Sequence, residues 1–472
     1  MSEPYSPDRL VSSIHQSRSL LPFAIDTLCD LITETTGKSP NRPLVEYTSL
    51  FWAMQTCDRV VASEPPRSSD AVVNPENVSF PPTRRSRILS SFSSKSRSIM
   101  IVDPYFKFRP VDELIAIQQS RHVLSWKSVP SVPDFVSSPD EKGRTRVFEG
   151  NTNDSDALTR LRRVFATTAP IELVEQHHAL AAWSNSESDP RVRLLYTANA
   201  HQSSIPFRYL MFAQRQRGTK IAVHQHGGGY GIDEMHFGEE HDISMSDVFF
   251  TWGWHRPDLG SRTRPLPTAF PAKRDVGTRR QYLLMSLPVT SHFYRFQPFL
   301  IPHHVERMVN ETVSFIRGLR ASTDLCFRSA PSAPFSVAQF HGAAVSPTFD
   351  KGREQGAKLA ARAGLVIHNY LGTSWLETLA MNVPTVCFYD PSIFRAREEA
   401  RPFIDALARV GVIHHSGAEA ARFVNDLNGD PSVWWSKPEV QEARESFVAR
   451  YANFKEDWLP GWMEEFERLL AE

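Results

Sequence analysis

Short apolar runs that alternate with amphipathic stretches constrain the fold of this chain more than any other feature. In the first half they predict strands at 98–103, 171–177, 191–198, 220–225 and 246–254, with a helix over 207–217. In the second half they predict strands at 281–288, 323–329, 364–370 and 383–390 and helices at 302–319, 353–364 and 375–382. Such near-continuous apolar runs are typical of parallel strands covered on both faces. We therefore expect an α/β protein.

The 472 residues favour two or three domains, and the composition along the chain suggests where they divide. Residues 1–98 read as a helical N-terminal extension, helical over 20–62, that ends in a Ser/Pro/Arg-rich loop. An α/β domain follows over 99–254, then a linker rich in Pro, Arg and Gly over 255–279. A second α/β domain with a helical tail covers 280–472. The sketch is two Rossmann-type, doubly wound domains that face a cleft.

Charge and cysteine usage limit the partners and the cellular compartment that we expect for this chain. Lys+Arg and Asp+Glu both number 53, so the chain lacks the basic excess that nucleic-acid binding normally needs. The four cysteines form no CxxC motif, which suits a reducing cytoplasm. The N-terminus has no signal-peptide pattern and no run approaches about 20 apolar residues, so any work at a membrane is expected from the cytosolic side. The default partner is a small molecule.

The first motif that can carry chemistry is QHGGGYG at 225–231, directly after a predicted strand. Its central residues are candidates for substrate binding: Gly227, Gly228, Gly229 and Tyr230. Consecutive glycines let the backbone approach a ligand and turn its N–H groups towards an anion. A tight turn is the other explanation, but a turn needs no imidazole, so His226 favours function and is a catalytic candidate.

Carboxylates follow this loop closely. Glu240 and Asp247 are candidates for a general base or a nucleophile, although each taken alone is more often a solvated or capping residue. Asp247→Asn is expected to abolish activity and leave the fold intact.

The second motif covers 368–377, between a predicted strand and a predicted helix. Tyr370, Thr373 and Ser374 would lie at the helix N-terminus, where N–H groups and the helix dipole favour a nucleotide phosphate. Glu377, one turn later, would reach ribose hydroxyls, although Ser374-x-x-Glu377 is also a capping box. Arg328 ends another strand at the same edge and would neutralise phosphate or pair with a structural carboxylate. Arg295, Arg395 and Arg397 are weaker candidates of this type.

Motifs of other enzyme classes are either absent or better explained by a structural role. The Asp154-Ser155-Asp156 run has the DxD form of a metal-binding site, but it opens a helical stretch, so capping is the expected role. The sequence has no GxxxxGK[ST], HExxH or GxSxG, which disfavours an ATPase, a zincin and an α/β-hydrolase. We expect no metal and no cofactor.

Taken together, these residues resemble a bacterial transferase family found in gene clusters for O-antigen and other surface carbohydrates. The matching positions over about 195–455 are QHGGGYG, Ser246-Asp247 ahead of TWGW, Thr373, Leu376-Glu377, Asn382-x-Pro384-Thr385, 411–414, Trp434-Trp435 and Val440-Gln441. The resemblance implies the two-domain GT-B arrangement, with the donor nucleotide in the C-terminal domain. The family is also distantly similar to retaining transferases that use CMP-Kdo. That similarity implies a carboxylate nucleophile, with Asp247 or Glu240 as candidates, and no bound metal.

We therefore expect a cytosolic GT-B-type glycosyltransferase that moves a sugar from a nucleotide-sugar donor to a bacterial surface glycan or lipid-linked glycan. Peripheral contact with the inner membrane stays open. So do three other functions: a sugar-nucleotide epimerase, a polyol-phosphate transferase on the same scaffold, and a non-catalytic scaffold subunit that binds nucleotide sugar without turnover.

Overall fold

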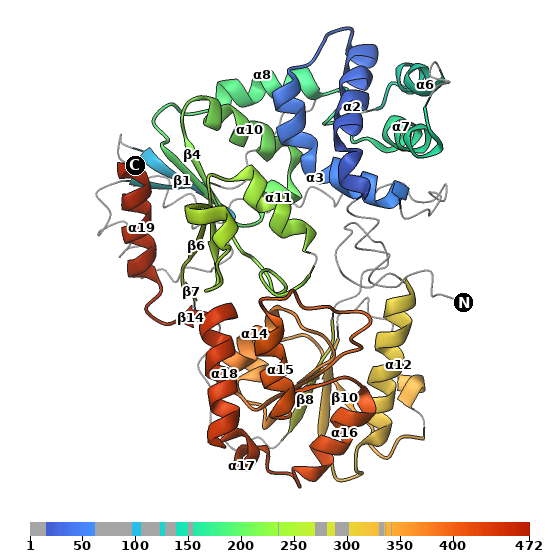
Figure 1. The fold of residues 1–472 in the computed structure, drawn as a ribbon, viewed down its shortest axis with the longest axis vertical. Coiled ribbons are helices and arrows are strands. Elements are labelled where there is room, and N and C mark those ends of the chain that lie inside the picture. Colours follow the sequence, from blue (N-terminus) through green and yellow to red (C-terminus); the bar gives the residue numbers. More distant parts are fainter. Residues whose placement is uncertain are drawn as a thin grey trace.

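The computed structural model describes residues 16–61, 97–104, 123–127, 138–149, 154–234, 236–269, 281–287, 302–329, 335, 337–340 and 342–472. Arg295, most of the predicted loop over 63–98 and the last ten residues of the predicted linker lie outside these ranges. Figure 1 shows two α/β domains, one above the other, with a helical layer on the N-terminal domain.

The helical layer consists of two helices of the predicted N-terminal extension, α2 and α3, and of four helices that come later in the chain, α6, α7, α8 and α10. Helix α2 ends where Gly37 adopts a left-handed backbone with φ of 69°, and α3 follows, so the helices expected over 20–62 are confirmed. Ser155 caps α7 by accepting a hydrogen bond from the N–H of Leu158, which confirms capping for the DxD run. The bounds are α2 Leu21–Thr36, α3 Arg42–Val61, α6 Glu141–Glu149, α7 Asp156–Thr168, α8 His177–Glu187 and α10 Ile205–Gln216.

The N-terminal domain is built on a six-stranded, wholly parallel sheet of order β2-β1-β3-β4-β5-β6. The order reverses between β1 and β3, which makes their carboxyl ends a topological switch point. All four residues of β3 are buried, as expected for a strand covered on both faces. The remaining elements are β1 Arg97–Val102, β2 Val123–Lys127, β3 Leu194–Thr197, α9 Ala200–Ser203, β4 Lys220–His224, α11 Phe237–Met245, β5 Val248–Thr251 and β6 Thr263–Pro265.

The C-terminal domain has a second six-stranded parallel sheet, of order β10-β9-β8-β11-β12-β13. This is the strand order of a dinucleotide-binding fold, and its switch point lies between β8 and β11. The strands are β8 Tyr282–Met285, β9 Leu325–Arg328, β10 Thr348–Phe349, β11 Leu365–His368, β12 Thr385–Phe388 and β13 Ile413–His414. The helices are α12 Pro302–Gly318, η2 Val337–Phe340, α13 Gly356–Ala360, α14 Thr373–Ala380, α15 Arg401–Arg409, α16 Gly417–Asp426, α17 Pro431–Trp435 and α18 Pro438–Tyr451.

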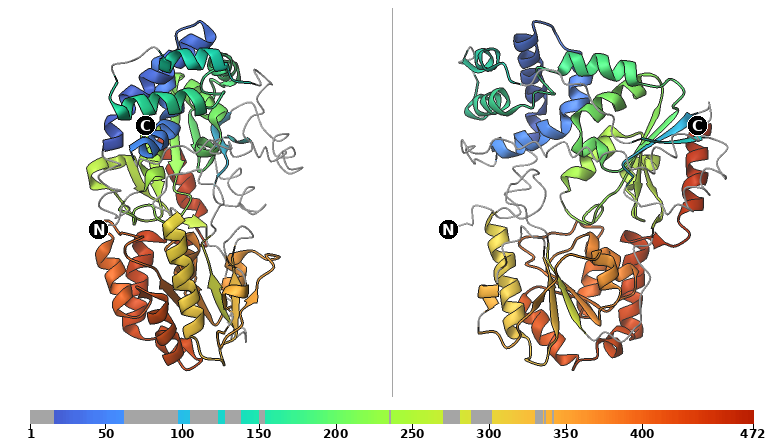
Figure 2. Two further views of the ribbon diagram at one scale, coloured as in Figure 1. Left: turned by 90° about the vertical axis from the view of Figure 1, so that its right-hand side faces the viewer. Right: turned by 180° about the vertical axis from the view of Figure 1, so that it is seen from behind.

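The connections between the domains differ from the expectation. Residues 257–269, predicted as linker, form the 3₁₀ helix η1 Pro257–Arg262, strand β6 and strand β7 Thr268–Ala269. Strand β14 Phe454–Lys455 pairs with β7, and helix α19 Leu459–Ala471 then returns to the N-terminal domain. Trp462 and Phe466 of α19 pack on the outer face of the first sheet beside Tyr196. Figures 1 and 2 show α19 alongside that sheet, away from the rest of the C-terminal half.

One strand prediction is wrong. Residues 171–176 form turns that lead into α8, because the backbone N–H groups of Leu173 and Gln176 bond to carbonyls only three and five residues earlier. Among the helices that the structure describes, none combines the length and apolar character needed to cross a bilayer.

Candidate active site

The glycine-rich loop 225–231 leaves the carboxyl end of β4, as predicted. Buried Gln225 anchors it: its side-chain amide donates to the carbonyl of Gly227 at 2.9 Å. The amide oxygen of Gln225 accepts from the backbone N–H of Trp252 at 3.0 Å and from the indole N–H of Trp254 at 2.8 Å. The loop and the TWGW run after β5 therefore pack as one unit.

The loop touches the second domain at Gly228. The backbone N–H of Gly228 donates to the hydroxyl of Thr373 at 2.8 Å. A Cβ at position 228 would lie 2.6 Å from the carbonyl carbon of Gly372 and 2.7 Å from the amide nitrogen of Thr373. Glycine is thus required here by close approach, whereas Gly229, with φ of 92°, serves the turn. The two anion-binding motifs predicted separately meet across the domain boundary.

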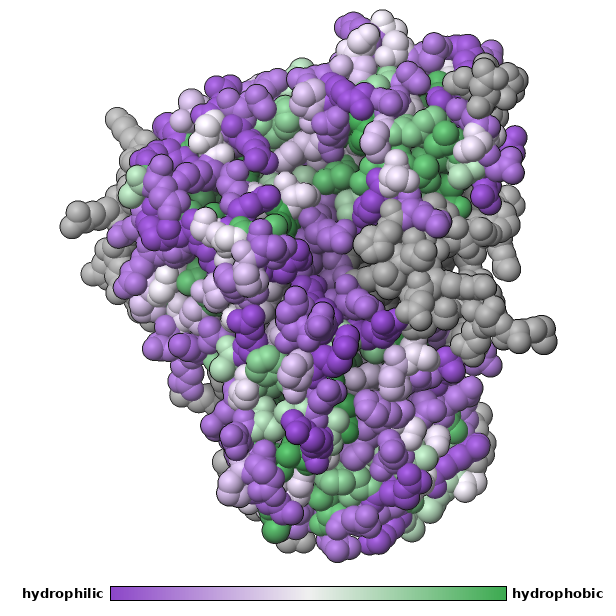
Figure 3. All heavy atoms as spheres, viewed as in Figure 1, coloured by the Kyte–Doolittle hydropathy of each residue, from purple (hydrophilic) through white to green (hydrophobic). Residues whose placement is uncertain are grey.

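A second set of contacts ties the same edges together. Arg397 in the β12–α15 connection forms a bidentate pair with Glu239 of α11, with both N–O distances 3.0 Å. The same guanidinium donates to the backbone carbonyl of Asp233, and Asp233 forms an antiparallel bridge with Ala396. Burial raises the pKa of the Asp233 carboxyl to about 8, against the opposing effect of Arg397. Figure 3 shows hydrophilic residues gathered along this boundary on one face.

Helix α14 presents the N-terminus expected from the second motif. Gly372 is its N-cap residue and no side chain caps the helix, so the alternative of a Ser374-x-x-Glu377 capping box is wrong. The hydroxyl of Ser374 instead lies 2.8 Å from the phenol oxygen of Tyr370. Within the described residues, the backbone N–H groups of Thr373 and Ser374 have no acceptor. These donors point out of the helix end, where an anion is favoured.

Glu377 lies one turn into the same helix. Its carboxylate makes no hydrogen bond or ion pair with another described residue, and burial raises its pKa to about 7. A partly buried acid whose pKa is raised towards neutrality is typical of functional sites, although structural acids also behave in this way.

Asp242 is one of the carboxylates that follow the loop in the sequence, but Glu240 and Asp247 were chosen from that cluster as the candidates. Asp242 of α11 is fully buried and bonds to His201 and to the hydroxyl of Tyr230. His226 lies beside it, with Nδ1 3.2 Å from the Tyr230 hydroxyl. His201 follows β3 at the topological switch point, and that position was the available signal.

The structure does not bring Asp247 or Glu240 to this site. Asp247 precedes β5 and lies at the amino edge of the sheet, where it pairs with Arg215 at 3.0 Å and accepts from the N–H of Ile221 at 2.8 Å. Glu240 points outward from α11, with its side chain 59% exposed, and pairs with Arg18. Geometry therefore moves the candidate carboxylate from these two residues to Asp242.

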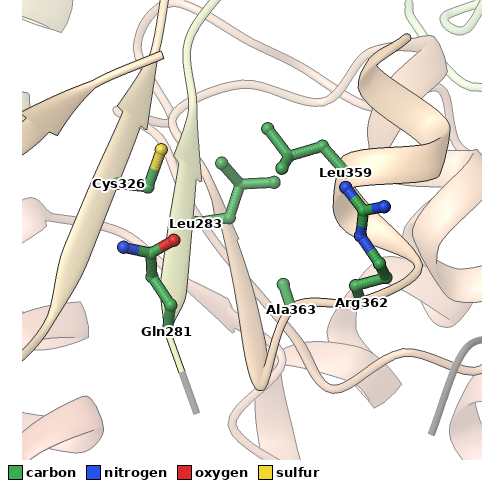
Figure 4. Close-up of a pocket in the computed structure, with 6 residues that line it drawn as sticks. All are labelled: Gln281, Leu283, Cys326, Leu359, Arg362 and Ala363. Atoms are coloured by element: carbon green, nitrogen blue, oxygen red, sulfur yellow. The ribbon is translucent and has the colours of Figure 1, made fainter. Parts of the chain in front are cut away.

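Two pockets mark the C-terminal sheet. One, a small hollow, lies at the carboxyl ends of β11 and β12 beside α12 and is lined partly by Glu311, Asn369, Tyr389 and Asp390. Asn369 also bonds to the backbone N–H of Leu287, which ties the segment after β8 to that after β11. The other, equally small, lies at the opposite, amino edge (Figure 4); its lining residues are Gln281, Leu283, Cys326, Leu359, Arg362 and Ala363.

Arg328 is at the carboxyl end of β9, as predicted, where it forms an ion pair with Asp350. Of the two roles expected for this arginine, the structure shows the pair with a carboxylate. Arg328 would have to leave Asp350 before it could reach a phosphate.

Two parallel sheets with facing carboxyl edges, and a final helix that returns to the first domain, define the GT-B class of fold. Within it, the chain belongs to the LIC12162 family of transferases, whose model matches residues 56–466. No curated protein matches the chain in sequence.

Three of the solved structures to which the chain is similar, all at low identity, are the following. The calicheamicin glycosyltransferase CalG4 is 13% identical, with 80% of this chain and 99% of that chain covered and a TM-score of 0.41. UGT89C1 from Arabidopsis thaliana is 10% identical, with 80% and 100% covered and a TM-score of 0.43. SnogD from Streptomyces nogalater is 11% identical, with 80% and 100% covered and a TM-score of 0.39. The strand order of the two sheets, rather than these distant similarities, defines the fold.

Proposed function

We propose that this transferase moves a glycosyl group from a nucleotide-sugar donor to a hydroxyl group of its acceptor. The observation that carries the proposal is the hydrogen bond between Gly228 and Thr373, which joins a glycine-rich loop to an uncapped helix N-terminus. Backbone N–H groups in both elements favour a phosphate or diphosphate. A nucleotide sugar carries that charge next to the carbon that reacts.

The C-terminal domain would hold the donor. The N–H groups of Thr373 and Ser374 would bind its phosphate, and Glu377 would accept hydrogen bonds from ribose hydroxyls. The base would lie at the carboxyl edge next to the switch point, beside Asn369 and Tyr389, where the small hollow would have to widen to admit it. The partial positive charge of these N–H groups, together with the charge of Arg328 once it has left Asp350, would stabilise the leaving phosphate. The proposal therefore includes no metal ion.

The N-terminal domain would hold the acceptor, with His226 and Tyr230 beside it. The sequence resemblance supports a bacterial surface glycan or lipid-linked glycan as acceptor and CMP-Kdo as one donor to test. In that role the chain would act at the cytosolic face of the inner membrane through peripheral contact.

The test is a thermal-shift screen of the full chain against CMP, CDP, UDP, GDP and ADP. A ligand at 100 times its Kd that binds only the folded chain stabilises it by about 2.7 kcal/mol, so a selective shift identifies the base. Thr373→Val should reduce the shift. Ser155→Ala, which removes a cap far from the site in α7, is the matched control and should not change it.

Turnover with the matching nucleotide sugars then separates the candidate functions. A glycoside product is the expected result. A free altered nucleotide sugar would indicate an epimerase, a phosphodiester a polyol-phosphate transferase, and tight binding without turnover a scaffold subunit. Each of those three results would contradict the proposal.

A further inference from the structure

Two short backbone segments pair with each other across the domain boundary. Residues 232–234 follow the glycine-rich loop, residues 395–397 follow β12, and the two segments form an antiparallel bridge between Asp233 and Ala396. We call these two segments the clamp. Its two further backbone hydrogen bonds run from the N–H of Glu234 to the carbonyl of Arg395, at 2.9 Å, and from the N–H of Arg397 to the carbonyl of Ile232, at 2.8 Å.

The clamp is continuous with the glycine-rich loop, because the N–H of Asp233 donates to the carbonyl of Gly229 at 2.8 Å. Gly228, the neighbouring residue, donates to the hydroxyl of Thr373 at the N-terminus of α14. The clamp therefore helps to hold the loop against the helix end that has free N–H groups.

The carboxyl of Asp233 lies inside this contact. The residue is only 4% exposed, and Oδ2 of its carboxyl has no hydrogen-bond partner within the part of the chain that the structure describes. A Cβ at Gly229 would lie 2.5 Å from that oxygen, so the carboxyl packs directly on the backbone of the loop. An ionised carboxylate is costly to bury without a hydrogen-bond donor. The closed clamp therefore favours the protonated acid.

Arg397 brings a positive charge into the clamp, but its hydrogen bonds go elsewhere. The guanidinium pairs with Glu239, and its Nε and Nη2 donate to the backbone carbonyl of Asp233 at 3.2 and 3.1 Å. Burial is the largest effect on the carboxyl and raises the pKa of Asp233 to about 8, with Arg397 opposing the rise and Glu239 adding to it.

Other titratable groups face Asp233 from the elements packed around it. His236, the N-cap of α11, lies against the same side of Gly229, and its Nδ1 accepts from the N–H of Glu239 at 3.0 Å. From the end of β12, Tyr389 stays neutral, because burial raises its pKa and charge on Asp233 adds to the rise. The remaining charged groups pair with one another: Arg397 and Arg256 with Glu239, and Arg395 with Glu234.

The effect of His236 is opposite in sign to that of Asp233. A proton on Nδ1 of His236 would remove the acceptor that caps α11 and so weaken the helix end that carries Glu239. Acid would then loosen the clamp through His236, whereas acid stabilises it through Asp233. The direction of the pH dependence distinguishes the two groups.

We infer that the clamp is a pH-dependent lock, which closes the two domains when Asp233 takes up a proton and releases them when Asp233 ionises. Opening exposes the carboxyl to water, where it is a hydrated carboxylate. Closing returns it to the dry contact as a neutral acid. One proton is therefore taken up for each closure.

The sign follows from proton linkage. The closed state binds the proton more tightly than the open state, so closure is favoured most below the ordinary carboxyl pKa of 3.8. This advantage is lost as the pH rises towards about 8. Since the closed arrangement sets Gly228 against α14, the lock also governs access to the N–H groups of Thr373 and Ser374. The inference goes beyond the proposed function and does not depend on which ligand those groups bind.

Amide hydrogen exchange tests the lock in the full chain without any substrate. The N–H groups of Glu234 and Arg397 are hydrogen-bonded across the boundary, so their protection factors, corrected for the intrinsic rate at each pH, measure closure. We expect both factors to fall as the pH rises from 6 to 8, by up to about tenfold per pH unit, the slope for one proton. Ala222 in β4 and Ile367 in β11 pair inside their own sheets and should keep constant protection.

Asp233→Asn should abolish the slope, because the side chain is neutral at every pH in this range. Asp233→Ser, which is neutral and smaller, serves the same purpose if Asp233→Asn does not fold. Glu234→Gln is the matched control: its carboxyl is in the same segment, but it is 30% exposed and already paired with Arg395. It should lower the protection by a similar small factor at each pH and keep the slope.

Constant protection of Glu234 and Arg397 between pH 6 and 8 in the unchanged chain would overturn the inference, and so would protection that rises with pH. A slope that persists in folded Asp233→Asn or Asp233→Ser would overturn it as well. None of these results would affect the proposed function, which is decided by nucleotide binding and by the product of transfer.

Discussion

The backbone N–H of Gly228 donates to the hydroxyl of Thr373 at 2.8 Å, although 145 positions separate the two residues in the chain. Each stands at the carboxyl edge of its own parallel sheet, one after β4 and one at the start of α14. The contact therefore fixes where a ligand that spans both domains can lie: beside this hydrogen bond, or between its partners once they separate.

Gly228→Ala should disrupt this contact and leave the rest of each domain intact. The new methyl group would lie 2.6 Å from the carbonyl carbon of Gly372, so loop and helix must move apart. We expect transfer to fall about 100-fold, since misplacement by about 1 Å costs that much in an oriented reaction. Initial rates measure the effect. Gly227→Ala is the control, because its methyl group would meet the Thr373 hydroxyl at an ordinary 3.5 Å; equal losses in both variants would contradict the explanation.

Arg397→Met should destabilise the chain by about 3 kcal/mol, because it leaves the buried carboxylate of Glu239 without its bidentate partner. Arg256 remains 3.5 Å from Glu239 and limits the loss. Urea denaturation followed by fluorescence measures it.

The neighbouring pair Arg395–Glu234 offers the comparison, since its side chains are 37% and 30% exposed. Arg395→Met should cost less than about 1 kcal/mol. A loss as large as that of Arg397→Met would show that burial of Glu239 is not what makes the Arg397 contact important.

Glu377→Gln should stabilise the chain above pH 7 and have no such effect at pH 4. Burial raises the pKa of Glu377 from 4.5 to about 7, so the folded chain binds this proton more tightly than the unfolded chain does. The free energy of unfolding therefore falls as pH rises through this window, by about 3 kcal/mol at most. Glutamine stays neutral and avoids the loss. Melting temperatures of both chains from pH 4 to 8 check the sign, and parallel curves would disprove it.

The same variant should weaken donor binding if Glu377 accepts hydrogen bonds from ribose. Greater stability with lower activity is the usual pattern when a functional acid is held in an unfavourable site.

Asp247→Asn should leave transfer almost unchanged, contrary to what the sequence alone suggests. Asp247 lies at the amino edge of its sheet and is half-exposed, so loss of its pair with Arg215 should cost less than about 1 kcal/mol. Asp242→Asn should lower kcat strongly. Rates of the two variants, normalised to folded protein, decide between the carboxylates; a 100-fold loss in Asp247→Asn at an unchanged melting temperature would restore Asp247 as the catalytic candidate.

Much of the fold could be predicted because buried parallel strands leave continuous apolar runs. The run at 171–177 misled because Ile171, Leu173 and Val174 alternate with glutamates, yet Pro170 introduces turns rather than a strand. The position of α19 could not be predicted, because an amphipathic stripe shows that a helix covers a sheet but not which sheet.

The site was predictable as two separate motifs. Their contact was not, because spacing along the chain carries no information about how domains pack. The distinction between Asp242 and Asp247 was available: Asp247 is the second residue of the strand predicted over 246–254, which places it at the amino edge, while ligands bind at the carboxyl edge of a parallel sheet. His201 comes soon after the strand predicted over 191–198 and could have been found by the same rule.

The return of α19 to the first sheet has a consequence for synthesis. Trp462 and Phe466 cover strands that begin at Arg97, so more than 360 residues must be added before that face is closed. A growing chain emerges at about 5–20 residues per second, which leaves apolar strand surface uncovered for roughly 20 seconds or longer. The N-terminal domain is thus completed only after α19 has been made, and a ribosome-bound intermediate would be open to chaperones throughout that interval.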